Sequence, residues 1–546
     1  MLALTHAGLH RGGWARRGAF SRTQAYTTLA AFIINLTLFG CAVGPNYSRE
    51  PAPVPTQFKE LKGFKFATPR DEVDRGDWWT PYRDPGLATL LREVEISNQT
   101  VAASAAAYEE ARAVIREAQA ALFPTATAGY SVTRTRTGPL VGLGNGKGGA
   151  AAPLLAMGAV QKTTTTAPIS GAWDLDVWGK VRRQIESNTA AAQASAADLD
   201  TAKLSAQAQL ATAYFNLRAA DSLYDLLERT IGEYKRTLAI TQNQFNAGVV
   251  SRADVITAQT QVLNVEAQAI NVGVQRAQFE HAIAMLIGRP PAELTVAHRG
   301  LTGNIPKIPV AVPSALLERR SDIAASERTM QEQNALIGVA EAAYFPDISL
   351  SSAVQYVGTI PLPFNAAHAI ESIGASASQS LFNGGLTAAQ VDAARAAYWQ
   401  SVANYRQTVL VAFEQVEDEL AAIHILTRQL AVERQAVSAA REAVEVFLNQ
   451  YRAGTVAFTT VVVAEATLLV DEEAELAVRQ NLFLASVSLI EALGGGWDTT
   501  LLPDQFQLQK GFSLVPQLES TKPLAVELMP APTTPSNPPG ALPAAQ

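Results

Sequence analysis

Two long stretches of this chain contain no proline, and they constrain the fold more than any other feature. Proline is absent from residues 169–289 and again from residues 364–502. Within both stretches, apolar residues recur at the three-and-four spacing that is typical of helices packed along a seam. A helix of about 65 residues would be roughly 100 Å long. Because an ordinary globular domain does not need helices of that length, we expect an elongated architecture.

The sequence also repeats itself at an offset of 206 residues. Residues 244–248 align with residues 450–454, and both segments end in Ala-Gly. A tandem repeat implies two copies of one supersecondary unit. We expect each unit to contain a helix, two strands and two long helices joined at the Ala-Gly turn. The first repeat would span residues 86–288 and the second residues 314–495, with a linker at residues 289–313.

Four shorter segments alternate between apolar and polar residues, with the period of two that predicts β-strands. They lie near residues 125–137, 163–176, 347–358 and 370–382. Four strands cannot close a barrel, and an open sheet edge cannot be buried in lipid. Two possibilities follow: the strands form a soluble sheet, or several chains contribute to one barrel. The segments are long enough to cross an outer membrane as strands.

The N-terminus has the pattern of a secretory signal peptide. Residues 1–40 contain four arginines and no acidic residue, and they end in a short apolar run at residues 27–39. That run is too short to span a bilayer as a helix. It ends in Gly40-Cys41, which is similar to a bacterial lipobox. We expect residues 1–40 to be removed and Cys41 to carry a covalent lipid, followed by an extended segment to residue 85. The alternative is a buried helix with an incidental cysteine.

Composition argues against several classes of function. The chain has 43 Lys and Arg against 50 Asp and Glu, so no broad basic face is available for nucleic acid. Cys41 is the only cysteine, which excludes a disulfide and a cysteine-based zinc site. A glycine-rich run at residues 142–149 lacks the Lys-Ser/Thr ending of a phosphate loop and is interpreted as a loop between strands. We therefore expect no enzyme, no metal and no cofactor. The proline-rich residues 496–546 are expected to be largely disordered.

Taken together and in order, these features resemble one family. The segment Cys41–Tyr47, the pair Trp78-Trp79 and the repeated Ala-Gly turns are similar to the TolC-like outer-membrane factors. The similarity is to their lipoprotein branch, which serves resistance-nodulation-division efflux pumps. The resemblance implies an α+β membrane protein that forms a homotrimer. Its twelve-stranded β-barrel, with four strands from each chain, would continue into a long periplasmic α-helical barrel built from the two tandem repeats.

The resemblance also implies roles for residues at the two helix reversals. In the family, this end of the helices is the closed periplasmic tip, which contacts a periplasmic adaptor. The residues expected there are Gly248, Ser251, Gly454 and Thr455. By motif position, Tyr451 and Asp254 match a tyrosine and an aspartate of the network that closes the tip. The simpler alternative is that the glycines only cap their helices and that Asp254 only stabilises the start of its own helix.

The function that the resemblance implies is a passive exit duct of a tripartite efflux pump for small toxic compounds. The duct would sit in the Gram-negative outer membrane, held by its barrel and by the lipid on Cys41, and would extend into the periplasm. Its partners would be a periplasmic adaptor and an inner-membrane pump of the resistance-nodulation-division class. Two alternatives stay open. The outlet of a type I protein secretion system would use the same duct, whereas a structural coiled-coil lipoprotein would need neither strands nor a repeat.

Overall fold

The computed structural model describes most of the chain, in the ranges 42–60, 77–137, 160–303, 305–306, 313, 316–358, 368–496 and 499–510. The expected signal peptide, Cys41, the glycine-rich run and the tail beyond residue 510 lie outside the described residues. The chain divides into two compact units. One unit contains the residues up to 45 together with 120–184 and 338–391, and the other contains 46–119, 185–337 and the residues from 392 onward.

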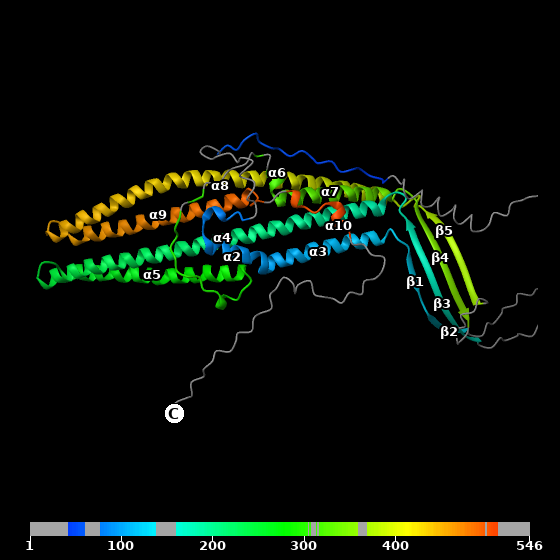
Figure 1. Cartoon of the computed structure of the whole chain (residues 1–546), viewed down its shortest axis with the longest axis horizontal. Helices are drawn as coiled ribbons and strands as arrows, with labels where there is room; N and C mark the ends of the chain where they lie inside the picture. The colour runs from blue at the N-terminus through cyan, green and yellow to red at the C-terminus, as the bar shows by residue number, and fades with distance from the viewer. Residues whose placement is uncertain are drawn as a thin grey trace, which may run out of the picture. The chain divides into compact units, whose positions relative to one another are not determined.

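An antiparallel sheet forms the centre of the first unit (Figure 1). The strands lie in the order β1–β3–β4–β5, and β2 also pairs with β3. Their bounds are Thr125–Ala128 for β1, Ser131–Thr137 for β2, Val160–Leu175 for β3, Asp347–Gly358 for β4 and Ala369–Ser378 for β5. Strands β3 and β4, which come from different repeats, pair from Thr165↔Gly358 to Leu175↔Ile348. Within the described chain, β1 and β2 at one edge and β5 at the other pair on one side only.

The strand predicted at residues 125–137 is interrupted in the structure. Strand β1 ends where Ala128 faces Ile169, and β2 begins where Ser131 faces Thr166. Pro168 lies opposite the gap and has no N–H for the ladder. Its carbonyl oxygen instead accepts a bond of 2.9 Å from the N–H of Gly129. The sheet also ends earlier than predicted, because β5 stops at Ser378 rather than near residue 382.

The helices follow the predicted repeat closely. Helices α4 and α8 have 67 residues each, and α5 and α9 have 35 each. Every bound of α8 and α9 lies 206 residues after its counterpart in α4 and α5. The bounds are α2 Pro85–Ser97, α3 Gln99–Ala120, α4 Lys180–Asn246, α5 Arg252–Leu286, α6 Leu316–Arg319, α7 Ser321–Ala342, α8 Leu386–Arg452, α9 Phe458–Ala492 and α10 Gln505–Gln509, with short 3₁₀ turns at Thr80–Tyr82, Pro291–Glu293 and Thr499–Leu501. None of the described helices combines the length and the apolar content that a membrane-crossing helix needs.

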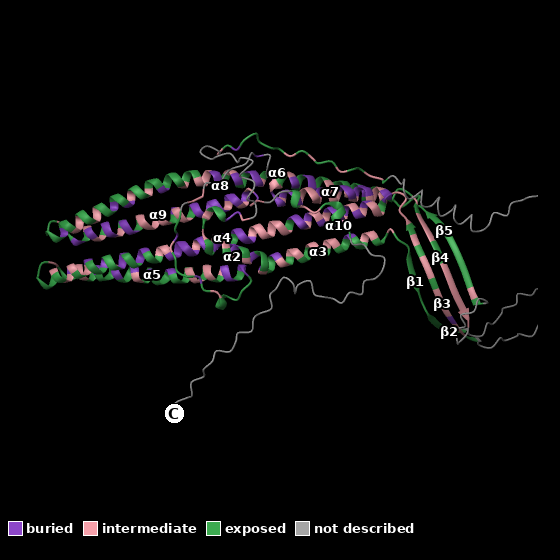
Figure 2. Cartoon of the chain, in the orientation of Figure 1, coloured by how far each residue is buried: buried purple, intermediate pink, exposed green. Residues whose placement is uncertain are grey.

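The long helices form two antiparallel hairpins, α4–α5 and α8–α9, and bury apolar residues in stripes along their facing sides (Figures 1 and 2). In the second unit, the largest cluster joins Leu87 and Leu91 of α2 to Tyr214 of α4 and Ile283 of α5. Another cluster joins α8 to α9 and to Phe58 of the N-terminal segment. The hydrophobic seams predicted from spacing therefore hold the hairpins together.

The start of the described chain is fixed within the first unit by a close backbone approach. Gly44 has a φ of +96°, and a Cβ there would lie 2.4 Å from the Cα of Gly338. Arg183 donates hydrogen bonds of 3.1 Å and 3.0 Å to the carbonyl oxygens of Val43 and Gly44. Val43 and Gly44, which closely follow Gly40-Cys41, are thus part of the folded unit.

The beginning of the predicted disordered tail is folded. Residues 505–509 form α10, whose capping box pairs Asp504 with Gln507. Leu508 is buried against Ile115 and Ala192. Burial of one apolar side chain between two helices can order a short polar segment. The prediction of disorder is therefore wrong for residues 499–510.

Candidate functional site

The first helix reversal, between α4 and α5, is closed by a left-handed glycine. Gly248 has a φ of +79°, and its N–H donates to the carbonyl oxygen of Phe245 over 2.9 Å. The N–H of Val249 donates to the carbonyl oxygen of Gln244 over 2.9 Å. This pair of bonds is the Schellman arrangement, in which glycine costs least because it has no Cβ.

The second reversal, between α8 and α9, has the same geometry. Gly454 has a φ of +74°, and its N–H donates to the backbone carbonyl oxygen of Tyr451 over 2.9 Å. The N–H and the hydroxyl of Thr455 both donate to the carbonyl oxygen of Gln450, over 3.0 Å and 2.9 Å. In the described part of the chain, no atom beyond the glycine and its two chain neighbours lies within 4 Å of a Cβ built at Gly248 or Gly454. The backbone angle, and not crowding, is therefore what requires glycine at both positions.

The helices that leave the two reversals begin differently. Ser251 and Asp254 form a capping box at the start of α5. The Asp254 Oδ2 accepts from the Ser251 N–H over 3.0 Å and from the Ser251 hydroxyl over 2.8 Å. At the equivalent position of α9, Ala457 provides no side-chain cap. Capping thus accounts for one oxygen of Asp254, and within the described chain its Oδ1 has no hydrogen-bond partner.

Tyr451 connects the two hairpins near their ends. Its side chain is 4% exposed and packs against Phe458 with a ring separation of 5.4 Å. Its hydroxyl donates to Oγ1 of Thr241 on α4 over 3.4 Å. Burial raises the pKa of Tyr451, and the negative charge of Asp254 adds to the shift. The hydrogen bond of the phenol therefore goes to Thr241, and none joins it to Asp254 within the described residues.

Further polar contacts join the two hairpins away from their ends. Thr237 of α4 donates to Oε1 of Glu465 on α9 over 2.7 Å. Gln268 of α5 donates to Oε1 of Glu473 over 2.7 Å. Gln480 donates to Oδ1 of Asn216 over 2.7 Å. These contacts were not predicted from the sequence, although polar side chains within an apolar seam are a signal that could have found some of them.

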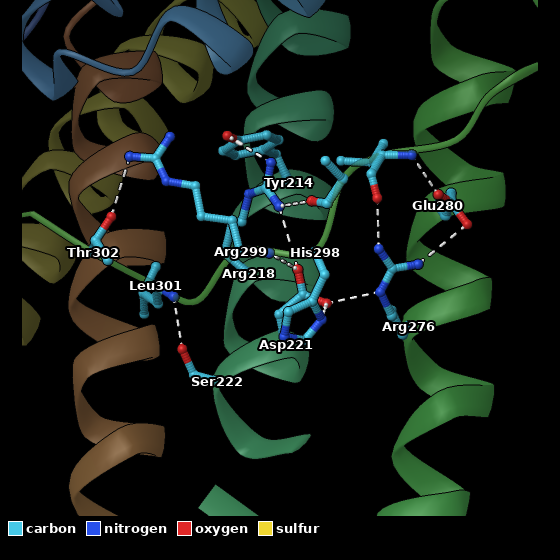
Figure 3. Close-up of polar contacts among 12 residues, drawn as sticks. Tyr214, Arg218, Asp221, Ser222, Arg276, Glu280, His298, Arg299, Leu301 and Thr302 are labelled. Carbon is cyan, nitrogen blue, oxygen red and sulfur yellow. Dashed lines mark hydrogen bonds and ion pairs between the residues drawn. The ribbon is translucent and has the colours of Figure 1, made fainter. Parts of the chain in front are cut away.

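A buried ionic network lies on α4 at a greater distance from the helix reversal (Figure 3). Asp221 has an exposed fraction of 0%, and its Oδ1 accepts from the Nε of Arg276 over 2.7 Å. The same oxygen lies 3.1 Å from Nδ1 of His298. The Oδ2 accepts from Nη1 of Arg218 over 3.3 Å and from the backbone N–H of Arg299 over 3.0 Å.

This network fixes the segment that follows α5. Arg218 donates to the carbonyl oxygen of Ala297 over 2.7 Å, and Arg276 donates to that of Val296 over 2.6 Å. The N–H of Leu301 donates to the hydroxyl of Ser222 over 2.6 Å. The start of the predicted linker is thus held against α4 and α5. Among the residues that the structure describes, no group of three or more His, Cys, Asp or Glu side chains could hold a metal ion.

Comparisons with known proteins agree with this architecture. A family model described as outer membrane efflux protein matches residues 90–289 and 312–495. The cation efflux system protein CusC of Escherichia coli O6:H1 is 26% identical over 473 residues, which cover 86% of this chain and 98% of CusC. The probable efflux pump outer membrane protein TtgC of Pseudomonas putida is 28% identical, over 87% of this chain and 96% of TtgC. The structure of the outer-membrane channel OprN is similar with a TM-score of 0.75 and 28% identity, covering 84% of this chain and 100% of that chain.

Proposed function

Because the chain belongs to the outer membrane efflux protein family, we propose that it is the exit duct of a tripartite efflux pump and passively conducts small toxic compounds. The family match confirms the resemblance inferred from the sequence. The likeness to OprN confirms the fold class, in which long repeated helices accompany an antiparallel sheet that one chain does not close. The family is one of transport channels, which agrees with the expectation that the chain is not an enzyme.

The open sheet is the observation that carries the proposal. Its edges, β1 with β2 on one side and β5 on the other, present unpaired peptide groups within the described chain. Each such group would cost several kcal/mol in lipid. Apolar side chains are exposed on this sheet, including Val132, Ile169 and Ile373. These features support a homotrimer in which lipid covers the outer surface and three copies supply twelve strands, with the interrupted β1 and β2 counted as one strand.

The reversals support an adaptor contact at the periplasmic end. Gly248, Ser251, Gly454 and Thr455 are all exposed, and backbone hydrogen bonds close both turns. Such turns present fixed backbone groups to a partner without having to order them on binding. In our proposal a periplasmic adaptor contacts these turns, an inner-membrane pump of the resistance-nodulation-division class drives transport, and Tyr451 and Asp254 help to close the tip.

A lipid on Cys41 would add a second attachment to the outer membrane. Arg183 holds Val43 and Gly44 in the first unit, and these residues follow the proposed lipid site closely in sequence, which supports an attachment there. Mass spectrometry of the native protein is expected to give an N-terminal acylated Cys41. An unmodified thiol, or a chain that retains residues 1–40, would contradict the lipoprotein assignment.

Deletion of the gene and reconstitution of the protein test the function together. The deletion strain is expected to become sensitive to several chemically unrelated toxic compounds, and the purified protein is expected to give single-channel conductance in a planar bilayer. Loss of one secreted protein with unchanged sensitivity would favour the type I secretion outlet. A protein without conductance would contradict the duct and favour a structural lipoprotein, although the sheet and the tandem repeat argue against that alternative.

A further inference from the structure

Glu465 is a buried carboxyl group at the joint between the two hairpins. It lies seven residues into α9, about 10 Å along the helix from its start. The residue is 8% exposed, and its one hydrogen-bond donor within the described chain is the hydroxyl of Thr237 on α4, at 2.7 Å. Thr237 is itself buried. The contact therefore links α9 to α4 through a group that is poorly solvated.

The charged groups around Glu465 do not neutralise it. On α4, Glu233 and Tyr234 face it, and neither carries a positive charge. Farther along α9, Glu473 is engaged by Gln268 of α5. Two cations of the same hairpins have other partners: Lys235 of α4 pairs with Glu266 of α5, and Arg441 of α8 pairs with Glu472 of α9. Within the described residues, no cation forms an ion pair with Glu465.

A buried carboxylate without a cation is costly in its ionised form, whereas the protonated form can remain in place. Separation of the hairpins would expose the group to water and remove that cost. At the equivalent position of the first repeat the chain has Gln259, a neutral side chain of the same size, which is exposed. Of these two equivalent positions, the buried one carries the ionisable side chain and the exposed one carries the neutral side chain.

From this geometry we infer that Glu465 is a proton-dependent switch of the hairpin joint: protonation favours packed hairpins, and ionisation favours their separation. The conductance part of this inference rests on the proposed exit duct, whereas the part on hairpin packing does not. Burial raises the pKa of Glu465 from 4.5 to about 7; the Thr237 hydrogen bond opposes this shift, and the charge of Glu233 adds to it. Burial also raises the pKa of Glu473.

The direction of the pH effect follows from linkage. In the packed state Glu465 holds its proton up to a pH of about 7, whereas a solvated carboxyl releases it near 4.5. Between these values the separated state binds fewer protons, so packing weakens as the pH rises. Each pH unit in this window changes the ratio of packed to separated hairpins by up to about tenfold per site.

The test compares purified full-length protein with the variants Glu465→Gln and Glu442→Gln over the range from about pH 4.5 to pH 8. Glutamine keeps the size and the hydrogen bond but cannot ionise, and Glu442 is an exposed glutamate of α8 that loses the same charge. In the wild type, the thermal midpoint is expected to fall, and the closed-channel conductance to rise, across the window. Glu465→Gln is expected to reduce the slopes of both profiles and to keep the midpoint higher, and the conductance lower, than in the wild type at high pH. Glu442→Gln is expected to retain the wild-type slopes.

Two results would overturn the inference. One is a Glu465→Gln variant that keeps the wild-type dependence of the thermal midpoint on pH. The other is a Glu465→Gln variant whose midpoint depends less on pH than that of the wild type while its conductance still follows the wild-type profile, since the hairpin joint would then not control the duct. If the wild type conducts at no pH, the exit-duct proposal fails, and the thermal midpoints alone still decide whether Glu465 is proton-linked.

Discussion

Gly248 and Gly454 occupy a left-handed backbone conformation at equivalent places in the two repeats. The surroundings leave room for a side chain at both positions, so the cost of any other residue comes from the backbone alone. Gly232 has the same free space but an ordinary backbone conformation. It lies within α4, has no positive φ and also has no atom within 4 Å of a built Cβ.

Gly454→Ala is expected to destabilise the protein by about 1–2 kcal/mol per chain, because an L-residue must adopt the left-handed conformation. Gly232→Ala is the matched control and is expected to stabilise by about 0.5–1 kcal/mol, since alanine loses less backbone freedom in a helix. Thermal unfolding of the two purified variants measures both effects. Shifts of the midpoint in the same direction would contradict this explanation of the reversal.

The hydroxyl of Tyr451 is expected to help keep the tip closed. Its bond to Thr241 joins α8 to α4 and is worth about 0.5–1.5 kcal/mol as a neutral hydrogen bond. Tyr451→Phe should therefore raise the conductance of the purified channel in the absence of an adaptor. Thr241→Val should do the same, although it also removes the bond of 3.0 Å from the Thr241 hydroxyl to the carbonyl oxygen of Thr237. The double variant should be no worse than the stronger single variant, because both changes remove the bond between Tyr451 and Thr241.

Asp254→Ala separates the two interpretations of that residue. If Asp254 contributes to the gate, the substitution raises the closed-channel conductance. If it acts only in the capping box with Ser251, the substitution lowers stability by about 1 kcal/mol and leaves the conductance unchanged. Unchanged conductance in both Tyr451→Phe and Asp254→Ala would remove the gate assigned to this pair.

At the scale of secondary-structure elements, the Asp221 network holds the segment after α5 in place. Asp221→Ala would leave Arg218 and Arg276 without their buried partner. Loss of one partner of a buried ion pair costs about 3–5 kcal/mol, and we expect a destabilisation near that range. Asp225→Ala, at a more exposed carboxylate that contacts His298, is the control and should cost less than about 1 kcal/mol.

Hydrogen exchange locates the effect of Asp221→Ala. The backbone groups of residues 296–301 are held by Arg218, Arg276, Asp221 and Ser222, so exchange should become faster there in this variant. The control variant should retain wild-type exchange in that segment. Uniformly faster exchange throughout α4 and α5 would indicate a general loss of stability and would contradict a local anchoring role.

The sequence predicted the elements whose signals are local. The long helices and their repeat follow from the absence of proline, the apolar spacing and the Ala-Gly turns, all of which can be read along the chain. The interruption of the first strand could not be predicted in this way, because Pro168 acts from a neighbouring strand. The partners of Asp221 are also distant in sequence, as Arg276 and Arg299 show, and Thr427 replaces the aspartate in the second repeat.

At the scale of the whole molecule, the two sheet edges decide how copies assemble. Strands β3 and β4 separate β2 from β5 in the sheet of one chain. Neighbouring strands lie about 4.8 Å apart, so β2 and β5 of one chain are roughly 14 Å apart along the sheet. A disulfide needs Cα atoms within about 7 Å. A disulfide between these two strands must therefore join different chains.

Disulfide scanning across the two edges is the most direct test of the proposed assembly. Cysteine pairs such as Thr133→Cys with Ser372→Cys, moved stepwise along β2 and β5, would be oxidised in the outer membrane and sized on a non-reducing gel. The control pair, Ser170→Cys with Ala353→Cys, joins facing residues of β3 and β4 and should give only monomer. A barrel closed by three chains predicts a covalent trimer at some pairs and no larger product. Monomer at every pair, or a ladder that continues beyond three chains, would contradict the closed trimeric duct.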